Sequence, residues 1–433
     1  MKSALTIAGS DSGGGAGIQA DLKSFAAVGV HGCSVVTCVT AQNTRSVDSI
    51  FPLPVDEVTA QLRAVLSDFA IGAAKTGMLY SAEIVRAVAD ALEGSRFPIV
   101  VDPVMVATVG ASLETRDLAA ALSRQLLPRA DLVTPNRYEA ERLSGRRVRS
   151  LADARIAARR ISSLGAGAVL VKGGHFRGEL VDLLYHEGRF TEYRSYRYPK
   201  ELHGSGCALG ASITGFLTAG DPLRVAIERG RQRVAMGFAT AYRAGHGVEI
   251  VNSHAIVDRH GIVRAVEDGA AVAARIIPLA WTPEVGVNLG YALPGATSLA
   301  DVCALAGRII RVGERLQATG PARFGASRHV ARIILTAMRY DPRLRSAINL
   351  KYREKNRTRL KKMGFALGTF AREREPRGAS TMEWGTEQAI RRLGRVPDVI
   401  ADRGAVGKEA MMRILGEEPA DVLRKVRRIV RGA

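Results

Sequence analysis

The feature that most constrains this chain is the alternation, over residues 1–245, of short apolar runs with segments of helical periodicity. The apolar runs predict strands at Ala4–Ala8, His31–Thr40, Ile71–Lys75, Pro98–Val101, Leu132–Thr134 and Ala168–Val171. Helices are predicted between them, most clearly at Gly17–Val28 and Val55–Phe69. Short apolar strands that are separated by helices typically form a parallel sheet covered on both faces. The N-terminal part is therefore predicted to be an α/β domain.

The same part of the chain is predicted to end in a hairpin and two helices. The hairpin is expected at Leu180–His186 and Arg189–Tyr196, and the helices at Ser205–Ala219 and Pro222–Tyr242. Gly245-His246-Gly247 then breaks the pattern, and residues 248–262 are predicted to be a linker. Because 433 residues are too many for one ordinary core, we expect two domains, at residues 1–250 and 262–433.

The second half has a weaker pattern of secondary structure. Helices are predicted at Ala326–Met338, Met382–Leu393 and Ala420–Ile429, and strands at Arg308–Val312, Ala347–Leu350, Gly364–Thr369 and Val399–Ala401. No internal repeat is detectable.

The net charge of +20 is concentrated in the second half. Lys and Arg exceed Asp and Glu by 5 over residues 1–254 and by 15 over residues 255–433. So basic a chain suggests a nucleic-acid partner, and the run Lys351–Lys362 adds to that impression. However, no zinc-ligand spacing, aromatic RNA-binding signature or clear helix-turn-helix is found. We therefore predict no nucleic-acid partner and interpret the run as a solvated basic face, with a pocket for phosphorylated small molecules as the alternative.

The sequence also bears on location. No stretch reaches the ~18 uninterrupted apolar residues of a membrane helix, and Met1–Gly9 is apolar for too few residues to be a secretory signal. Four cysteines without a CxxC pair are too few for a disulfide framework. We expect a cytoplasmic homo-oligomer that has no membrane partner.

The first glycine-rich loop, Gly9–Gly17, follows a predicted strand and opens a predicted helix. A dinucleotide fingerprint does not fit, because Ile18 stands where the third glycine of GxGxxG belongs, and the chain contains no P-loop motif. The loop is then either a tight turn or a backbone that approaches a ligand closely at a helix N-terminus.

The second glycine-rich loop, His203–Gly210, also precedes a helix. Gly204 and Gly206 could direct several backbone N–H groups to one point, which makes an anion hole for a transferred phosphoryl group. Cys207 falls in the first helical turn, where the helix dipole is expected to lower the thiol pKa and favour a thiolate base. The alternative is a small buried cysteine at a helix start.

Further polar residues follow other predicted strands. Asn136 and Glu139 are three residues apart and carry the oxygen ligands that Mg²⁺ binds through water, although the pair could equally be a helix cap. Lys172 stands beside Gly173 at the carboxyl end of a strand, the edge at which open parallel sheets bind ligands.

Taken in order, seven motifs of the first half resemble hydroxymethylpyrimidine/phosphomethylpyrimidine kinase, a thiamine-biosynthesis family of the ribokinase superfamily. The resemblance covers roughly residues 3–250. Its motifs are Ala4–Asp21, Thr40–Thr44, Lys75–Leu79, Val101–Met105, Thr134–Glu139, Val171–Gly174 and His203–Cys207. It implies a ribokinase-like three-layer α/β/α fold and two successive ATP-dependent phosphorylations of a hydroxymethylpyrimidine. Pyridoxal kinase, from the same superfamily, is the alternative.

The resemblance also implies roles for individual residues. Those expected to line the pyrimidine pocket are Gly9, Asp21, Gln42 and Met78. Gln42 can both donate to and accept from a ring N–C–NH₂ edge. Cys207 stands where most ribokinase relatives have a catalytic Asp, and Gly204–Gly206 would form the anion hole. The residues expected on the ATP–Mg²⁺ side are Asn136, Glu139 and Lys172.

The second half resembles the thiamine-phosphate synthase domain that is often fused to this kinase and is unrelated to the TIM-barrel synthase. The motifs are Pro283–Asn288, Asp301–Arg308, Phe324–Ala331, Pro397–Ile400 and Gly404–Glu409. This resemblance implies a second, smaller α/β/α domain, which would join the pyrimidine diphosphate to thiazole phosphate and release pyrophosphate.

Both substrates of such a synthase are polyanions, which accounts for a basic, arginine-rich half. By resemblance, Arg308 and His329 are the leading catalytic candidates, and Arg328 and Lys408 are weaker candidates for phosphate contacts. Domains of this type also occur in transcription regulators, where they sense thiamine phosphate behind a DNA-binding module. Here a kinase takes the place of that module, which favours the enzyme, and a sensing module stays as the alternative.

Overall fold

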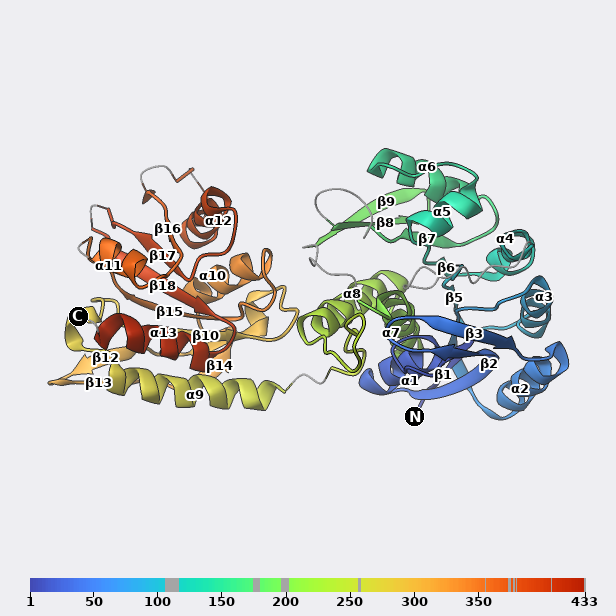
Figure 1. Cartoon of the computed structure of the whole chain (residues 1–433), viewed down its shortest axis with the longest axis horizontal. Coiled ribbons are helices and arrows are strands. Elements are labelled where there is room, and N and C mark those ends of the chain that lie inside the picture. Colours follow the sequence, from blue (N-terminus) through green and yellow to red (C-terminus); the bar gives the residue numbers. More distant parts are fainter. Residues whose placement is uncertain are drawn as a thin grey trace. The chain divides into compact units, whose positions relative to one another are not determined.

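The computed structural model describes residues 1–105, 117–173, 180–195, 202–255, 258–354, 356–372, 375, 376, 378, 380–405 and 407–431. The chain divides into two compact units, Met1–Ile256 and Val257–Ala433. Each unit has its own sheet and its own hydrophobic core, and Figure 1 labels the elements of both.

The first unit is built on a nine-stranded sheet. The strands are β1 (Ser3–Asp11), β2 (His31–Gln42), β3 (Val47–Pro52), β4 (Ile71–Thr76), β5 (Ile99–Val101), β6 (Leu132–Val133), β7 (Ala168–Val171), β8 (Leu180–His186) and β9 (Arg189–Ser195). Their order is β3-β2-β1-β4-β5-β6-β7-β8-β9, and the strands from β2 to β7 pair in parallel. The antiparallel strands β3, β8 and β9 lie at the two ends. The predicted parallel sheet and hairpin are confirmed, and β3 was not predicted.

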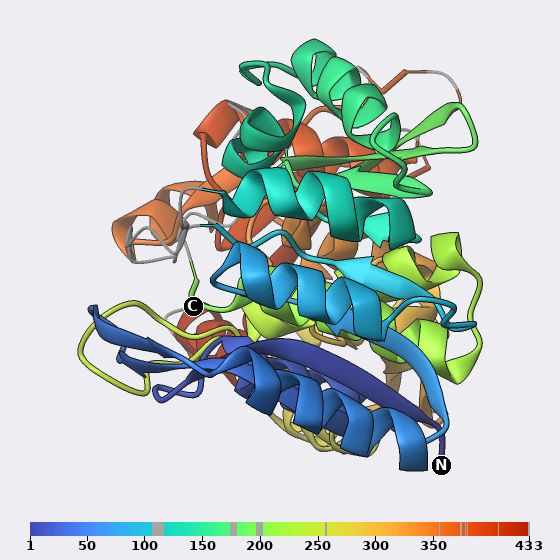
Figure 2. The same ribbon diagram turned by 90° about the vertical axis from the view of Figure 1, so that its right-hand side faces the viewer.

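Helices cover both faces of this sheet (Figure 2). They are α1 (Gly17–Ala27), α2 (Val55–Asp68), α3 (Ala82–Ala91), α4 (Leu118–Ala121), α5 (Arg137–Ser144), α6 (Leu151–Ser162), α7 (Ser205–Ala219) and α8 (Leu223–Ala239), with a π-helical turn at Leu122–Leu126 and a 3-10 turn at Leu127–Arg129. One face buries apolar side chains of α2, α3 and α6, such as Leu62 and Ile161. The other buries those of α1, α7 and α8, such as Phe25 and Ile213. The unit is therefore a three-layer α/β/α domain.

Parallel pairing places the carboxyl ends of the central strands at one edge of the sheet. Asp11 ends β1, while Asp102, Thr134 and Lys172 directly follow β5, β6 and β7. These polar side chains come after strands that are almost wholly buried, so this edge is where the first unit can bind a ligand.

The second unit contains a seven-stranded sheet and a separate two-stranded hairpin. The strands are β10 (Leu289–Ala292), β11 (Val302–Leu305), β12 (Ile309–Val312), β13 (Arg315–Ala318), β14 (Ala322–Phe324), β15 (Ser346–Lys351), β16 (Leu367–Thr369), β17 (Val399–Asp402) and β18 (Met411–Gly416). The order is β14-β11-β10-β15-β18-β17-β16, with β12 and β13 as the hairpin. Only β16 and β17 are recorded as a parallel pair among the described strands of this unit.

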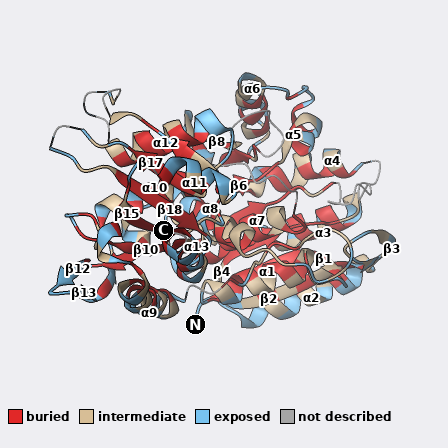
Figure 3. Cartoon of the chain, turned by 60° about the vertical axis from the view of Figure 1, so that its left-hand side comes forward, coloured by how far each residue is buried: buried red, intermediate tan, exposed pale blue. Residues whose placement is uncertain are grey.

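Helices again lie on both faces, and the buried strands between them are red in Figure 3. They are α9 (Arg259–Ile276), α10 (Arg328–Met338), α11 (Asn356–Lys362), α12 (Thr381–Leu393) and α13 (Pro419–Arg431), with 3-10 turns at Leu279–Trp281 and Leu299–Asp301. Apolar side chains of α9 and α13 pack into one core, and those of α10 and α12 into another. The predicted second α/β domain is confirmed. The helix α9 begins at Arg259, inside the segment expected to be a linker.

Within the residues that the structure describes, every helix is too short or too polar to cross a membrane.

Candidate active sites

The two glycine-rich loops of the first unit touch each other. Gly204 has a φ of +85°, and a Cβ atom at this position would overlap the carbonyl oxygen of Gly15 in the first loop. Gly17 has a φ of +56°, and a Cβ atom there would overlap the carbonyl oxygen of Gly9. Only glycine fits these two positions, because a side chain would be strained as well as overlapped. The glycines of the two loops therefore allow two backbone segments to lie close together at the carboxyl edge of the sheet.

A buried hydrogen bond between Asp11 and His203 connects the loops. The Asp11 carboxylate accepts backbone N–H groups of Gly13, Gly15 and Ala16 in the first loop. Its Oδ2 also lies 2.9 Å from Nε2 of His203, which directly precedes Gly204. Burial alone would raise the pKa of Asp11, but the hydrogen bond and charge of His203 and the backbone N–H groups hold it below its ordinary value. Asp11 is thus an ionised clamp on the first loop.

Cys207 lies in the first turn of α7, as predicted, and its sulfur accepts the backbone N–H of Gly17 at the start of α1. The prediction that this position lowers the thiol pKa is wrong. Burial raises the pKa of Cys207 to about 11, and the nearby Lys75 ammonium offsets only part of that rise. The helix dipole is outweighed by burial, and the nearby carboxylates of Asp21 and Asp102 raise the thiol pKa as well. Cys207 is therefore a thiol before substrate binds.

Beneath Cys207 lies a completely buried ion pair. Lys75 on β4 reaches Asp21 on α1, with 3.0 Å between Nζ and Oδ2, and the Thr6 hydroxyl donates to the same oxygen at 2.7 Å. Burial raises the pKa of Asp21 despite these partners, while its carboxylate raises the pKa of Lys75 above the ordinary value, although burial alone would lower it. The other oxygen of Asp21 has no hydrogen-bond partner. Lys75 lies within the motif Lys75–Leu79, and the sequence analysis missed its role, although a lysine inside an apolar strand indicates a buried partner.

We expect Lys75→Met to lower the free energy of unfolding by about 3–5 kcal/mol, because it leaves the Asp21 carboxylate buried without its counter-charge. Urea denaturation of the full chain measures this loss. Arg63→Met on the exposed side of α2 is the matched control and should stay within about 0.5 kcal/mol of the parent. Equal stabilities of the two variants would contradict a structural role for the pair.

A second charged group extends from the buried pair toward the second loop. Lys172 contacts Asp102, with 2.8 Å between Nζ and Oδ1, and lies 3.9 Å from Oε2 of Glu139. A Cβ atom at Gly206 would lie 3.4 Å from Nζ of Lys172, so this ammonium borders the second loop. Burial would raise the pKa of Asp102, but Lys172 and Lys75 keep it below its ordinary value. A lysine and the first-turn N–H groups of α7 thus surround one position beside Cys207.

Asn136 and Glu139 form a capping box at the start of α5, which confirms the helix-cap interpretation of this pair. The Asn136 side chain accepts the N–H of Glu139, and the Glu139 carboxylate accepts the N–H of Asn136. Burial raises the pKa of Glu139 to about 7. No cluster of three His, Cys, Asp or Glu side chains that could hold a metal ion occurs in the described ranges. The donor set fits a hydrated Mg²⁺ that is held through water, because each carboxylate and amide oxygen keeps a second lone pair.

The residues expected to line the pyrimidine pocket lie around the first loop. A Cβ atom at Gly9 would lie 2.7 Å from the Cys38 sulfur and 3.5 Å from the Met78 sulfur. Gln42, at the end of β2, has its backbone N–H and C=O bonded to the Ser12 hydroxyl at 2.8 and 2.7 Å. Its side-chain amide lies 3.2 Å from Nε2 of His203. Gly9 and Met78 are thus adjacent, and Gln42 lies where both loops meet.

In the second unit, a cavity of about 300 Å³ brings together most of the expected residues. Arg308, Arg328 and His329 line it, as do Asn288 and Arg332. Lys408 is not among the lining residues; it is exposed in the connection between β17 and β18, where its backbone pairs with Ala405.

Behind His329 lies a charged cluster that the sequence analysis missed. Asp402, at the end of β17, binds the guanidinium groups of Arg413 and Arg372, the latter at 2.7 Å. Burial and, after it, the charges of Arg413, Arg308 and Arg372 lower the pKa of His329 to about 4, so its imidazole is neutral at pH 7. The available signal was Arg413 itself, a charged residue inside the apolar run Met411–Leu415.

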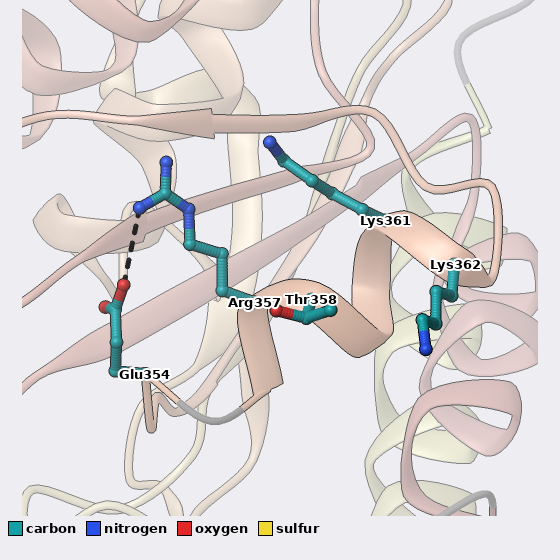
Figure 4. Close-up of a pocket in the computed structure, with 5 residues that line it drawn as sticks. All are labelled: Glu354, Arg357, Thr358, Lys361 and Lys362. Atoms are coloured by element: carbon teal, nitrogen blue, oxygen red, sulfur yellow. Dashed lines mark hydrogen bonds and ion pairs between the residues drawn. The ribbon is translucent and has the colours of Figure 1, made fainter.

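Figure 4 shows a wider hollow beside α11, lined by Glu354, Arg357, Thr358, Lys361 and Lys362. Arg357 pairs with Glu354 at 3.4 Å, and the five side chains are exposed. Leu360, on the opposite side of the helix, is buried. This arrangement fits the interpretation of the run Lys351–Lys362 as a solvated basic face.

Comparisons with known proteins agree with both resemblances. Residues 11–252 match the phosphomethylpyrimidine kinase family, and residues 263–428 match the family described as thiamine-phosphate synthase ThiN. The bifunctional thiamine biosynthesis protein ThiDN of Methanocaldococcus jannaschii is 31% identical over 427 residues, which are 98% of this chain and 97% of that protein. The thiamine biosynthesis bifunctional protein ThiED of Geobacter sulfurreducens is 48% identical over 253 residues, 58% of this chain but only 52% of that protein.

Among solved structures, the ADP complex of Bacillus subtilis pyridoxal kinase is 34% identical, with a TM-score of 0.55, and the match covers 58% of this chain and 97% of that one. The first unit therefore has the ribokinase-like fold of these kinases. By its two matched domains and its full-length relative, the chain belongs to the family of bifunctional thiamine-biosynthesis enzymes in which a phosphomethylpyrimidine kinase is joined to a thiamine-phosphate synthase domain.

Proposed function

We propose that residues 1–250 form the kinase and that Cys207 is the base of both phosphorylations. The observation that carries this proposal is the convergence of Cys207, the N–H groups at the start of α7 and the Lys172 ammonium beside both glycine loops. This is the arrangement that a phosphoryl transfer needs: a proton acceptor, donors for the charged oxygens and a cation.

In the first step, the thiol of Cys207 releases its proton to solvent water, and the resulting thiolate takes the proton of the substrate hydroxyl. That oxygen forms a bond to the γ-phosphorus of ATP, and the bond from this phosphorus to the β-bridging oxygen breaks, which leaves ADP. The N–H groups of Gly204–Gly206 and the Lys172 ammonium would stabilise the negative charge on the transferred group. In the second step, a phosphate oxygen of the monophosphate product forms the bond to the γ-phosphorus of a second ATP, and the bond from this phosphorus to the β-bridging oxygen again breaks to leave ADP.

On the nucleotide side, Lys172 would contact the phosphates, while Asn136 and Glu139 would hold Mg²⁺ through water. When bound, this ion neutralises charge on the ATP phosphates. On the other side, Gly9, Asp21, Gln42 and Met78 would form the pyrimidine pocket, above a floor made by the first glycine loop.

Gln42→Glu is expected to raise the KM for hydroxymethylpyrimidine about tenfold or more, because it replaces an amide donor by an acceptor in a site built to hydrogen-bond the ring. The KM for ATP should change far less. Steady-state kinetics with each substrate varied in turn measures both values. Gln317→Glu, an exposed residue of the second unit, is the control. An unchanged pyrimidine KM would show that Gln42 does not contact the ring.

We propose that residues 262–433 form the synthase and that the cavity between Arg308 and His329 is its active site. The C–O bond between the pyrimidine methylene and the diphosphate breaks, and its electron pair leaves with pyrophosphate. The thiazole nitrogen forms the new C–N bond with its lone pair.

Arg308 would hold the departing diphosphate, while His329, as a neutral imidazole, would donate a hydrogen bond to it or accept a proton. Arg328 would contact phosphate at the rim, and Lys408 is retained as a weaker candidate for the same role.

A single reaction mixture tests both proposals. Purified full-length chain, hydroxymethylpyrimidine, ATP, Mg²⁺ and thiazole phosphate should yield thiamine phosphate. Accumulation of the pyrimidine diphosphate without thiamine phosphate would contradict the synthase, and no phosphorylation at all would contradict the kinase.

We further propose that the chain acts in the cytoplasm as a homo-oligomer whose partners are these small molecules, not nucleic acid or membrane. Light scattering and filter binding test this.

A further inference from the structure

The side-chain amide of Gln42 is held between two polar groups that each have fixed hydrogen-bonding roles. The atom placed as Nε2 lies 3.2 Å from Nε2 of His203, and the atom placed as Oε1 lies 3.4 Å from the Thr40 hydroxyl. A half-turn of the amide exchanges these two atoms at no change in shape, so the partners decide which orientation is occupied.

The first partner, His203, can only donate from Nε2. This nitrogen lies 2.9 Å from the Asp11 carboxylate, and a carboxylate oxygen only accepts. Asp11 is kept ionised by His203 and by three backbone N–H groups, against the effect of burial. The hydrogen on Nε2 of His203 therefore points at Asp11, and this nitrogen has no lone pair to accept an amide N–H. The Gln42 oxygen, which can share that hydrogen, is the favourable neighbour.

The second partner, Thr40, leads to the same orientation independently. Its hydroxyl donates its one hydrogen to the backbone carbonyl of Ser10 at 3.0 Å. The hydroxyl oxygen has lone pairs left but no second hydrogen, so it can accept from Gln42 and cannot donate to it. The amino group of Gln42 belongs next to Thr40, and its oxygen next to His203.

We propose that the Asp11–His203 pair fixes the polarity of the Gln42 amide, so that Gln42 offers the substrate ring a hydrogen-bond donor. His203 is then a positioning residue for ring recognition. This inference rests on the proposed function, in which Gln42 reads the pyrimidine.

The chemistry of the ring that fits follows from this polarity. One N–H of the Gln42 amino group goes to Thr40, and the other is free for a ligand. A free donor matches a ring nitrogen that carries a lone pair, as in a neutral aminopyrimidine, and repels a ring position that carries its own N–H. Ring selection would thus be set by a carboxylate in the first loop acting through a histidine in the second.

Two substitutions at one position separate this role from a merely structural one. His203→Gln keeps an N–H donor at about the place of Nε2, whereas the side chain of His203→Asn is too short to reach Asp11. We expect His203→Asn to raise the pyrimidine KM about tenfold, the equivalent of one lost hydrogen bond. His203→Gln should recover most of that loss, and the KM for ATP should change little in either variant. His186→Asn is the matched control, because His186 on β8 pairs with Ala168 at the amino end of β7, away from the carboxyl edge of the sheet. This variant should leave both KM values as in the parent.

A double-mutant cycle with Gln42→Glu completes the test. If His203 orients Gln42, the cost of Gln42→Glu on pyrimidine KM should be smaller in the His203→Asn background than in the parent, because part of the oriented donor is already lost. Additive effects would overturn the proposal, as would equal rises of pyrimidine and ATP KM in His203→Asn. A parent enzyme that does not phosphorylate the pyrimidine would instead contradict the proposed function.

Discussion

Cys207→Ala is expected to lower the rate of pyrimidine phosphorylation by ~10²–10⁴, the usual cost of losing a general base. ATP binding should stay nearly intact, because the groups proposed to hold the phosphates are the α7 N–H groups and Lys172, none of which the substitution removes. Single-turnover phosphorylation of both pyrimidine substrates measures the rate, and nucleotide titration measures the affinity. Cys33→Ala, a buried thiol near the start of β2 and away from the carboxyl edge, is the control.

The pH profile gives a second readout of Cys207. With a thiol pKa of about 11, the thiolate fraction increases about tenfold for each unit of pH between 7 and 10. The single-turnover rate of the parent should therefore climb with pH over this range and level off only near pH 11, and Cys207→Ala should lack this slope. Unchanged turnover of the variant with both pyrimidine substrates would exclude Cys207 as the base.

Arg308→Ala and His329→Ala should each reduce thiamine-phosphate formation by ~10²–10³, the usual cost of removing one group that stabilises a developing anion. Both residues line one cavity, and pyrophosphate gains negative charge as the C–O bond breaks. The full chain is supplied with pyrimidine diphosphate and thiazole phosphate without ATP, so that the kinase is not needed. Circular dichroism checks that the variants stay folded.

Arg315→Ala and His260→Ala, two exposed residues of the same unit, are the matched controls and should retain parent rates. Tight thiamine-phosphate binding by the parent chain with no turnover would contradict the synthase and favour a sensing module. Steep salt-dependent binding to DNA would instead support a nucleic-acid function.

The dependence of synthase activity on pH, on the acidic side, tests whether the His329 imidazole is neutral. Because burial and three guanidinium groups lower its pKa to about 4, activity should be flat through pH 6.5 and fall only as pH approaches 4. A limb near the ordinary histidine value would mean that the imidazole is more hydrated and less crowded by charge than the structure indicates.

Most of the first unit could be predicted from sequence because its central strands are buried on both faces and read as apolar runs. The second unit was harder for a physical reason. Its sheet is largely antiparallel, and strands such as β10 and β11 are short and rich in small residues, including Gly290 and Cys303. A Cβ atom at Gly290 would overlap the Val330 side chain, so glycine is needed here for close packing against α10. Because glycine has a low β-propensity, the sequence pattern of this strand is weak.

The site shows the same limit. Motif spacing indicated which residues gather, but the chemical state of each depends on neighbours that are distant in sequence. The pKa of Cys207 is set by burial and by Lys75, Asp21 and Asp102, which lie on β4, on α1 and directly after β5. The sequence analysis considered only the dipole of the helix that carries Cys207, and it therefore predicted a lowered thiol pKa where the structure indicates a raised one.

The close approach of Gly204 to the carbonyl oxygen of Gly15 has a consequence for protein engineering. The loop that carries the base and the loop beneath the pyrimidine pocket fit only as a matched pair, because neither backbone leaves room for a bulkier version of the other. Transplanting the substrate preference of this kinase into a related scaffold would therefore require exchanging both loops at once. A chimera that receives one loop alone would carry a steric mismatch at its centre, and selection for new specificity would have to move through paired changes nearly two hundred positions apart in the gene product.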